Sequence, residues 1–133
     1  MPSLLVVDDD PLNTKLLTIL LGTAGYAVTA VHSAPEAIAT LERTPYDLLL
    51  LDIMMPGMDG LALCRRIRQT SSVPIIFVSA RGTVTDEQEA AAAGGDAYVR
   101  KPFVPDALLA QVEALLPRSQ VRAAGASDIP VRG

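Results

Sequence analysis

Short runs of hydrophobic residues alternate along the chain with longer segments in which hydrophobic residues recur every three or four positions. The short runs are typical of strands buried on both faces and occupy residues 4–7, 27–31, 48–51, 75–78 and 97–99. The longer segments have the spacing of amphipathic helices and occupy about 11–22, 35–43, 61–68, 86–93 and 105–116. This alternation predicts an α/β fold, with a doubly wound, five-stranded parallel sheet covered by helices on both faces.

Local signals support this division into helices. The apolar side of the first helix, which Pro11 is placed to open, is marked by Leu12, Leu16, Ile19 and Leu20. Ser33 and Glu36 have the spacing of a capping box and predict the start of the second helix. On the third helix we expect a solvated side that carries Arg65, Arg66 and Arg68.

Length and composition agree with one domain of ordinary size. The chain has 133 residues, half of them hydrophobic, and no tryptophan, so its core must be largely aliphatic. Residues 117–133 are rich in Ala, Gly, Ser and Pro and show no hydrophobic period. We therefore expect a domain over residues 1–116 and a flexible tail or linker over 117–133.

Charge and cysteine content indicate the setting in which the protein works. The net charge is −4, and residues 117–133 carry about +2, which leaves about −6 on the rest. Such an acidic body can hold a cation and argues against direct binding of nucleic acid. Cys64 is the only cysteine, which excludes an internal disulfide and favours a reducing compartment. No signal peptide or membrane span is visible, because Asp52 interrupts the longest hydrophobic run, so we expect a soluble, cytoplasmic protein.

Polar residues follow the predicted strands at the ends where parallel sheets bind ligands. Asp8 and Asp9 follow the first strand, and Asp52 follows the third. If these strands are neighbours, three carboxylates meet. Two like charges about 4 Å apart repel by roughly 1 kcal/mol in water and about 4 kcal/mol at an effective dielectric near 20. A divalent cation relieves this repulsion, and an all-carboxylate ligand set favours Mg²⁺, Mn²⁺ or Ca²⁺ over zinc.

The same edge of the sheet has the groups needed for phosphoryl transfer. A carboxylate such as Asp52 can act as a nucleophile and form an aspartyl phosphate. Phosphoryl transfer depends on positioning and on neutralising the phosphate charge. Lys101, after the fifth strand, can neutralise phosphate oxygens, and Ser79, at the end of the fourth, can donate a hydroxyl hydrogen bond.

Four separated motifs now resemble one known family. They are the acidic segment 6–10, Asp52 with the loop 55–60, Ser79 with Ala80, and Tyr98 with the segment 101–103. In this order and at these intervals they resemble the receiver domains of bacterial response regulators, over about residues 3–116. The resemblance implies a flavodoxin-like fold with strand order 2-1-3-4-5 and a cytoplasmic role in two-component phosphorelay signalling.

Carried over residue by residue, the resemblance implies a metal-assisted phosphorylation site. Asp52 is then the phosphoacceptor. Asp9 ligates Mg²⁺ directly, Asp8 does so largely through water, and the backbone carbonyl of Met54 completes the protein ligands, with Mn²⁺ as a possible substitute. Lys101 pairs with the phosphate and, before phosphorylation, with Asp52.

The resemblance also implies a two-state switch. Ser79 is its hydroxyl, and Tyr98 packs inward when Ser79 moves to the phosphate. The Lys101–Pro102 bond resembles the family's cis peptide. A sensor histidine kinase or a histidine phosphotransfer protein is the expected phosphodonor, and an output domain C-terminal to the chain is possible.

One departure concerns the output. Receivers fused to winged-helix DNA-binding domains usually carry an acid and two arginines for dimer salt bridges near three positions of the last helix. In this chain those positions are Ala107, Gln111 and Glu113. The departure weakens the case for that dimer and that type of output.

Two rival functions stay open at this level. A phosphatase of the haloacid-dehalogenase kind also uses an Asp nucleophile, but it expects a second Asp two residues later, where Met54 stands. A degenerate receiver that only binds partners expects a gap in the acidic set, and none is seen. His32 and Cys64, the only histidine and cysteine, are interpreted as a loop residue and an inert core thiol.

Overall fold

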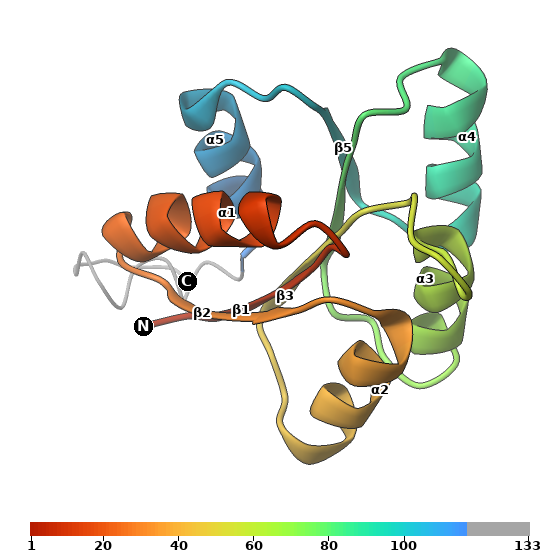
Figure 1. Cartoon of the computed structure of the whole chain (residues 1–133), viewed down its shortest axis with the longest axis horizontal. Coiled ribbons are helices and arrows are strands. Elements are labelled where there is room, and N and C mark those ends of the chain that lie inside the picture. Colours follow the sequence, from red (N-terminus) through yellow and green to blue (C-terminus); the bar gives the residue numbers. More distant parts are fainter. Residues whose placement is uncertain (117–133) are drawn as a thin grey trace, which may run out of the picture.

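The computed structural model describes residues 1–116 as one parallel sheet with helices on both sides (Figure 1). The strands are β1 (Ser3–Val7), β2 (Ala27–Val31), β3 (Leu48–Leu51), β4 (Ile75–Ser79) and β5 (Ala97–Arg100). The helices are α1 (Pro11–Thr23), α2 (Ala34–Arg43), α3 (Gly60–Arg68), α4 (Val84–Ala93) and α5 (Pro105–Leu115). The strand order is β2-β1-β3-β4-β5, which confirms the predicted fold. The predicted tail, 117–133, lies outside the described residues.

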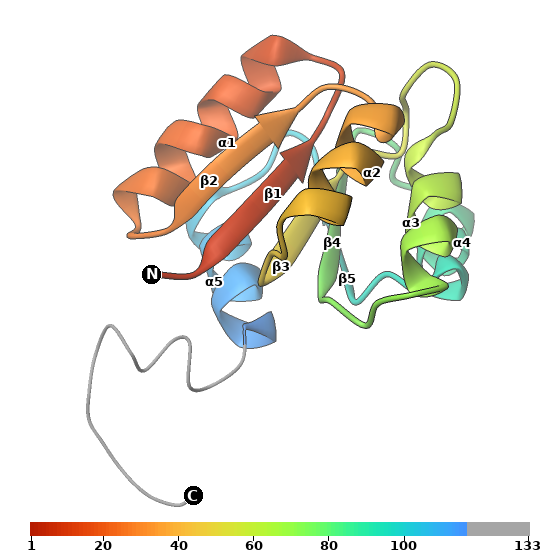
Figure 2. The same ribbon diagram turned by 90° about the horizontal axis from the view of Figure 1, so that it is seen from below.

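Each face of the sheet has its own hydrophobic core. Helices α1 and α5 cover one face, and α2, α3 and α4 cover the other (Figure 2). Along β1, Leu4 and Val6 pack toward α1 and α5, whereas Leu5 and Val7 pack on the opposite side. Because successive side chains of a strand point to opposite faces, a strand buried on both faces must be hydrophobic at every position. This requirement explains the unbroken runs of the sequence.

The first helix is turned differently from the sequence prediction. Leu12, Leu16 and Ile19 are 73%, 52% and 58% exposed, whereas Leu17 and Leu21 are buried. Leu20 is partly buried against the core. Hydrophobic residues occur on all sides of α1, so their spacing alone could not indicate which side faces the sheet. The expected apolar side was therefore wrong at three positions, and the structure leaves a hydrophobic stripe exposed.

Polar caps define where the helices start. Asp10 caps α1 by accepting the Leu12 N–H at 2.9 Å. Ser33 accepts the Glu36 N–H at 3.2 Å, as predicted, but the Glu36 carboxylate accepts the main-chain N–H of His32, a bend residue. Thr83 caps α4, which therefore begins two residues earlier than the sequence indicated.

The arginines of α3 do not all face solvent. Arg65 and Arg66 are exposed, as predicted. Arg68 instead donates to the main-chain carbonyls of Ser71, Val73 and Gly94 and pairs with Asp96 at 3.0 Å. The prediction was wrong for Arg68 because its acceptors come from loops that only the folded chain brings to the end of α3.

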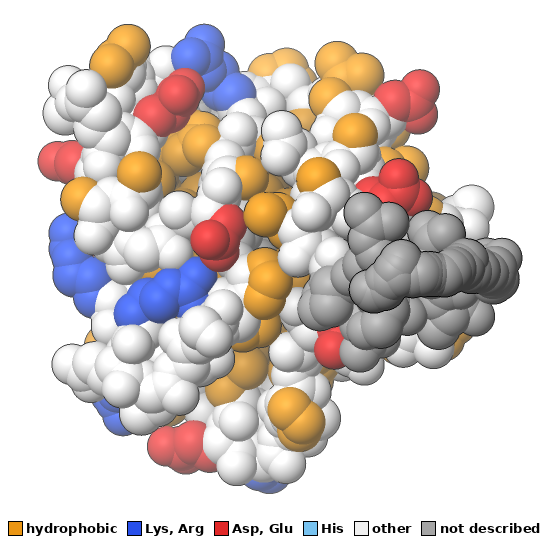
Figure 3. Space-filling view, turned by 180° about the vertical axis from the view of Figure 1, so that it is seen from behind, with side chains coloured by type: hydrophobic (Ala, Val, Ile, Leu, Met, Phe, Trp, Pro, Cys, Tyr) orange, Lys and Arg blue, Asp and Glu red, His pale blue; other side chains and the backbone are white. Residues whose placement is uncertain are grey.

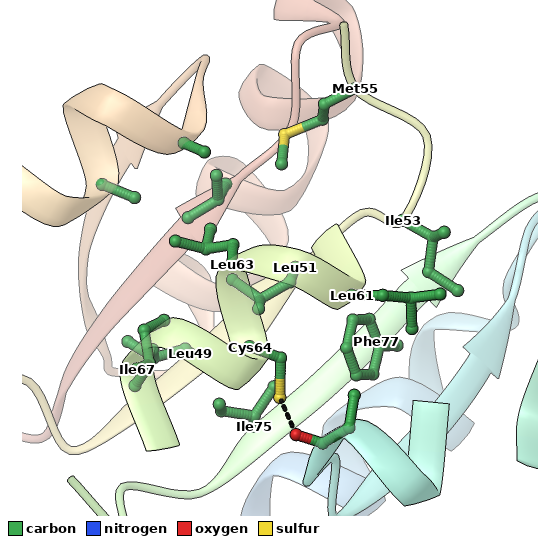
Figure 4. Packing of buried hydrophobic residues seen from close by; sticks show 14 of the residues in the cluster. Leu49, Leu51, Ile53, Met55, Leu61, Leu63, Cys64, Ile67, Ile75 and Phe77 are labelled. Carbon is green, nitrogen blue, oxygen red and sulfur yellow. Dashed lines mark hydrogen bonds between the residues drawn. The ribbon is translucent and has the colours of Figure 1, made fainter. Parts of the chain in front are cut away.

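The buried thiol of Cys64 lies in the core between α3 and α4. It is fully buried, and its Sγ donates to the Ala93 carbonyl at 3.3 Å (Figure 4). Burial raises the pKa of the Cys64 thiol, which keeps it protonated at neutral pH. This placement agrees with the predicted core thiol.

Candidate functional site

The site is built at the carboxyl ends of β1, β3, β4 and β5. Parallel pairing aligns Val7 with Leu51 and Ser79 with Arg100. The residues that follow these pairs therefore lie along one edge of the sheet. The Asp52 N–H donates to the Val7 carbonyl at 2.9 Å, and the Lys101 N–H donates to the Ser79 carbonyl at 2.9 Å. The main chain thus continues the strand pairing into the site and fixes where its side chains begin.

Asp8 is a buried carboxylate with two partners. Its side chain is nearly inaccessible; one oxygen accepts the Asp10 N–H at 2.9 Å and the other accepts from Lys101 Nζ at 2.8 Å. Burial raises the pKa of Asp8, and the hydrogen bonds from Lys101 and Asp10, which favour the ionised form, only partly offset this effect. The nearby charge of Asp52 raises it further.

Asp52 lies directly beyond β3 and is also buried. One carboxylate oxygen accepts the Met54 N–H at 3.2 Å, and the other accepts from Lys101 Nζ at 3.0 Å. The start of α3 packs closely against its main chain, since a Cβ at Gly60 would lie 2.0 Å from the Asp52 carbonyl oxygen. The sequence indicated only that Gly60 belongs to the loop 55–60, whereas the structure requires glycine there because any larger residue would collide with the main chain of Asp52.

Lys101 joins the two buried carboxylates. Its ammonium lies 2.8 Å from Asp8 and 3.0 Å from Asp52. Burial by itself lowers the pKa of Lys101, but the hydrogen bonds to the two carboxylates and their negative charges together outweigh burial and raise the pKa above its usual value. The contact with Asp52 was expected from the family resemblance. The contact with Asp8 was missed, because nothing in the sequence spacing indicates that the Lys101 side chain, separated from β1 by two strands, extends as far as the end of β1.

The acidic cluster has the composition of a site for a hard divalent cation. Asp8, Asp9 and Asp52 each offer a carboxylate oxygen, and these oxygens lie within 4.8 Å of one another. Asp9 is exposed, so a hydrated ion can approach from solvent. An all-oxygen ligand set that keeps several waters fits Mg²⁺. Met54, the fourth predicted ligand, has its side chain exposed and its N–H bound to Asp52.

The two predicted switch residues, Ser79 at the end of β4 and Tyr98 in β5, both contact Arg81 in the loop after β4. Ser79 is fully buried, and its Oγ accepts the Arg81 N–H at 3.3 Å. The Tyr98 hydroxyl donates to the Arg81 carbonyl, and its ring lies 6.5 Å from that of Phe77. Burial raises the pKa of Tyr98. The Lys101–Pro102 bond is cis, as predicted.

Comparison with known proteins identifies the family. A family model described as the response regulator receiver domain matches residues 4–113. The chain belongs to this family. The curated relative ResD of Bacillus subtilis, a transcriptional regulatory protein, is 41% identical to this receiver domain over 116 residues, which cover 87% of this chain and 48% of ResD. The chain spans about half the length of the curated relatives it matches.

Solved structures agree with the receiver fold. A response regulator of Chloroflexus aurantiacus has a TM-score of 0.84 and 36% identity, covering 88% of this chain and 98% of that one. The BeF3-activated receiver domain of Klebsiella pneumoniae RstA has a TM-score of 0.84 and 30% identity, covering 87% and 99%. The chain is therefore a receiver domain of two-component response regulators, a signalling family. Within the described residues, no helix is long and apolar enough to span a bilayer.

Proposed function

We propose that Asp52 of this receiver domain accepts a phosphoryl group from a phosphohistidine. One observation carries the proposal: a carboxylate at the edge of the sheet is held 3.0 Å from the ammonium of Lys101, within the acidic cluster. A carboxylate oxygen of Asp52 attacks phosphorus and forms a P–O bond. The P–N bond of the donor breaks, and the imidazole nitrogen keeps its electron pair. The product is an aspartyl phosphate.

Lys101 neutralises charge before and after the transfer. In the free domain its ammonium binds Asp8 and Asp52. After transfer it binds a phosphate oxygen in place of the Asp52 carboxylate, so the new negative charge meets a cation that is already in place. The ammonium is already close to the acceptor, because the phosphoryl group is added to one oxygen of the carboxylate that it binds.

The metal site of this proposal uses the acidic cluster. Asp8, Asp9 and Asp52, with the carbonyl of Met54, would hold Mg²⁺, or Mn²⁺ in its place. When bound, the ion supplies positive charge to the phosphoryl oxygens. With a divalent ion bound, the charges of the three carboxylates, Lys101 and the ion nearly cancel, so an incoming phosphate would not be repelled. We infer the same site for autophosphorylation by small phosphodonors and for later hydrolysis.

Ser79 and Tyr98 change position in this proposal when Asp52 is phosphorylated. Ser79 exchanges its contact with Arg81 for a hydrogen bond to a phosphate oxygen, and Tyr98 settles inward behind it. Full burial of Ser79 at the end of β4 supports this role, because a buried hydroxyl exchanges one partner for another rather than for water.

The phosphodonor of this proposal is a protein, either a sensor histidine kinase or a histidine phosphotransfer protein. The exposed stripe of Leu12, Leu16 and Ile19 supports a protein donor, because only three residues separate the end of β1 from the start of α1, which places the stripe next to the acidic cluster. An apolar helix face beside a reaction site is typical of a protein contact. The single free thiol of Cys64 suits a cytoplasmic setting.

An output domain C-terminal to the receiver is part of the proposal, since relatives such as ResD are about twice as long and are named as transcriptional regulators. We expect no direct contact of the receiver itself with nucleic acid, which is bound by clustered basic side chains. Figure 3 supports this expectation for one face, where acidic and basic side chains are interspersed around a broken band of hydrophobic atoms.

Acetyl phosphate tests the central step. Incubation of the full chain with acetyl phosphate and Mg²⁺ should add one phosphoryl group, measured by intact-protein mass spectrometry. Asp52→Asn should abolish the adduct, because an amide is a poor nucleophile. Asp106→Asn, a change of the same kind at an exposed acid of α5, should leave the adduct unchanged. A wild-type chain without adduct, or an adduct that survives Asp52→Asn, contradicts the proposal.

A further inference from the structure

The main chain of Arg81 contacts both predicted switch residues. Its N–H donates to Ser79 Oγ at 3.3 Å, and its carbonyl accepts from the Tyr98 hydroxyl. A displacement of either side chain therefore changes a hydrogen bond to Arg81. Ser79 is fully buried and Tyr98 is half-buried, so water cannot freely replace the hydrogen bonds that join these two side chains to Arg81.

The side chain of Arg81 continues this contact into the first turn of α4. Its guanidinium pairs with Asp86 at 3.1 Å. The other carboxylate oxygen of Asp86 accepts from the N–H and the hydroxyl of Thr83, at 3.0 and 2.9 Å, and completes the capping box of the helix. Both oxygens of Asp86 are thus engaged. Arg81 is attached to the residue that holds the start of α4 in place.

A second ion pair joins the end of β5 to the first turn of α4. Arg100 pairs with Glu87 at 3.5 Å, and its side chain lies against Gly82, where a Cβ would be 2.3 Å from the arginine Nε. Both members of this pair are about half exposed, so solvent screens it. The Arg81–Asp86 pair is better shielded, with Asp86 buried. The better-shielded pair is therefore the stronger of the two connections to α4.

We propose that Arg81 is a positioning residue that transmits a movement of Ser79 and Tyr98 to the first turn of α4. It is held at its N–H, its carbonyl and its guanidinium, so it cannot follow Ser79 without pulling on Asp86 or breaking the ion pair. Either result changes how firmly the capping box holds α4. The loop after β4, green in Figure 1, leads directly into α4. The inference rests on the proposed phosphorylation of Asp52 and names how its state reaches a helix surface.

The movement starts at a site that does not include the Arg81 guanidinium. In the described residues the one ion pair of that group is with Asp86. In the free domain the Arg81 guanidinium is therefore held by α4 and not by the carboxylates of the acidic cluster. Removal of its charge should leave phosphorylation possible and weaken its effect on α4.

Amide hydrogen exchange with beryllofluoride, a phosphoryl mimic, and Mg²⁺ tests this role in the full chain. In the wild type the amides of residues 83–87 should change exchange rate by about fivefold or more on addition of the mimic, at the low end of typical coupling between linked sites. Arg81→Gln should remove most of this change. Arg81→Lys, which keeps the charge, should restore part of it, and Arg65→Gln, at an exposed arginine of α3, should leave it as in the wild type.

Mass spectrometry after acetyl phosphate treatment separates the two proposals. If Arg81→Gln is phosphorylated at Asp52 and residues 83–87 still respond as in the wild type, the inference is wrong and the proposed function stands. If the wild type takes no phosphoryl group, both are wrong.

Asp86→Asn removes the same ion pair by changing the acid instead of the arginine, and it keeps a polar residue in the capping box. It should also lose the response, and a full response in that variant overturns the inference as well.

Discussion

Lys101 shows how one side chain can satisfy two buried acids. Asp8 and Asp52 are both buried, and in the described residues their one cationic partner is this ammonium. An unpaired charge in such a place is costly, whereas a shared cation and main-chain hydrogen bonds offset the loss of water. The two buried carboxylates are therefore tolerated in the free domain, with the Lys101 ammonium already bound between them.

Removing that ammonium should destabilise the domain. Lys101→Met keeps the apolar stem and leaves two buried carboxylates without their cation, so we expect a loss of about 3–5 kcal/mol in the free energy of unfolding at pH 7 without Mg²⁺. Urea unfolding measures it. Lys15→Met, at an exposed lysine of α1, should change stability by less than about 0.5 kcal/mol. An equally small effect for Lys101→Met would contradict the buried pairing.

Asp86 should make the domain sensitive to acid. Hydrogen bonds from the Thr83 N–H and hydroxyl, with a smaller contribution from Arg81, hold the pKa of Asp86 below its usual value. A carboxylate with a lowered folded-state pKa stabilises the fold above its unfolded pKa of about 3.9 and loses this effect as pH falls through the folded value. The stability difference between the wild type and Asp86→Asn should thus be constant from about pH 5 to 8 and shrink below about pH 4.

Urea unfolding at several pH values measures that difference. Glu89→Gln, at an exposed acid of the same helix, controls for the general effect of removing a negative charge from α4. A difference for Asp86→Asn that stays constant down to the acid transition would show that the capping interactions do not favour the ionised carboxylate.

At the scale of elements, α1 combines a buried side and an exposed hydrophobic stripe. Leu17 and Leu21 pack into the core, whereas Leu12, Leu16 and Ile19 do not. Local spacing could not separate these two groups, because both recur at helical intervals. The rotation of the helix is decided by the packing of Leu17 and Leu21 into the core, a tertiary constraint.

Two adjacent leucines of α1 test this assignment. Leu17→Ala should lower the free energy of unfolding by about 2–5 kcal/mol, because it opens a cavity in the core. Leu16→Ala, the same change one residue earlier at a 52% exposed position, should cost less than about 0.5 kcal/mol. Urea unfolding of both variants measures the contrast. Similar losses at the two positions would mean that the helix is rotated from the orientation described.

For the whole molecule, the sheet order decides what can meet. Because β1 lies between β2 and β3, the ends of β1 and β3 are neighbours and their acids converge. The three acidic residues lie close together although 43 positions separate Asp9 from Asp52 in the chain. Lys101 supplies one positive charge to three carboxylates, so part of their mutual repulsion remains in the free domain, and a bound divalent cation should relieve it.

Magnesium should therefore stabilise the entire fold. At about a hundred times its Kd, a ligand specific for the folded state adds about 2.7 kcal/mol to the free energy of unfolding. Thermal unfolding with and without Mg²⁺ measures the rise in Tm, and excess EDTA should reverse it. Asp9→Asn should remove most of the rise. Asp10→Asn, the same change at the neighbouring cap outside the cluster, should keep it, and equal rises in both variants would argue against this site.

The fold class, the strand order implied by the family resemblance and the acids beyond β1 and β3 could all be predicted from the amino-acid sequence. These follow from local patterns: runs that must be buried on both faces, and motifs at set intervals. The tertiary structure alone decided which side of α1 is exposed, why Arg68 is held by loop carbonyls, and that Lys101 reaches Asp8 as well as Asp52. Such contacts depend on the relative placement of distant strands and helices, which local spacing does not encode.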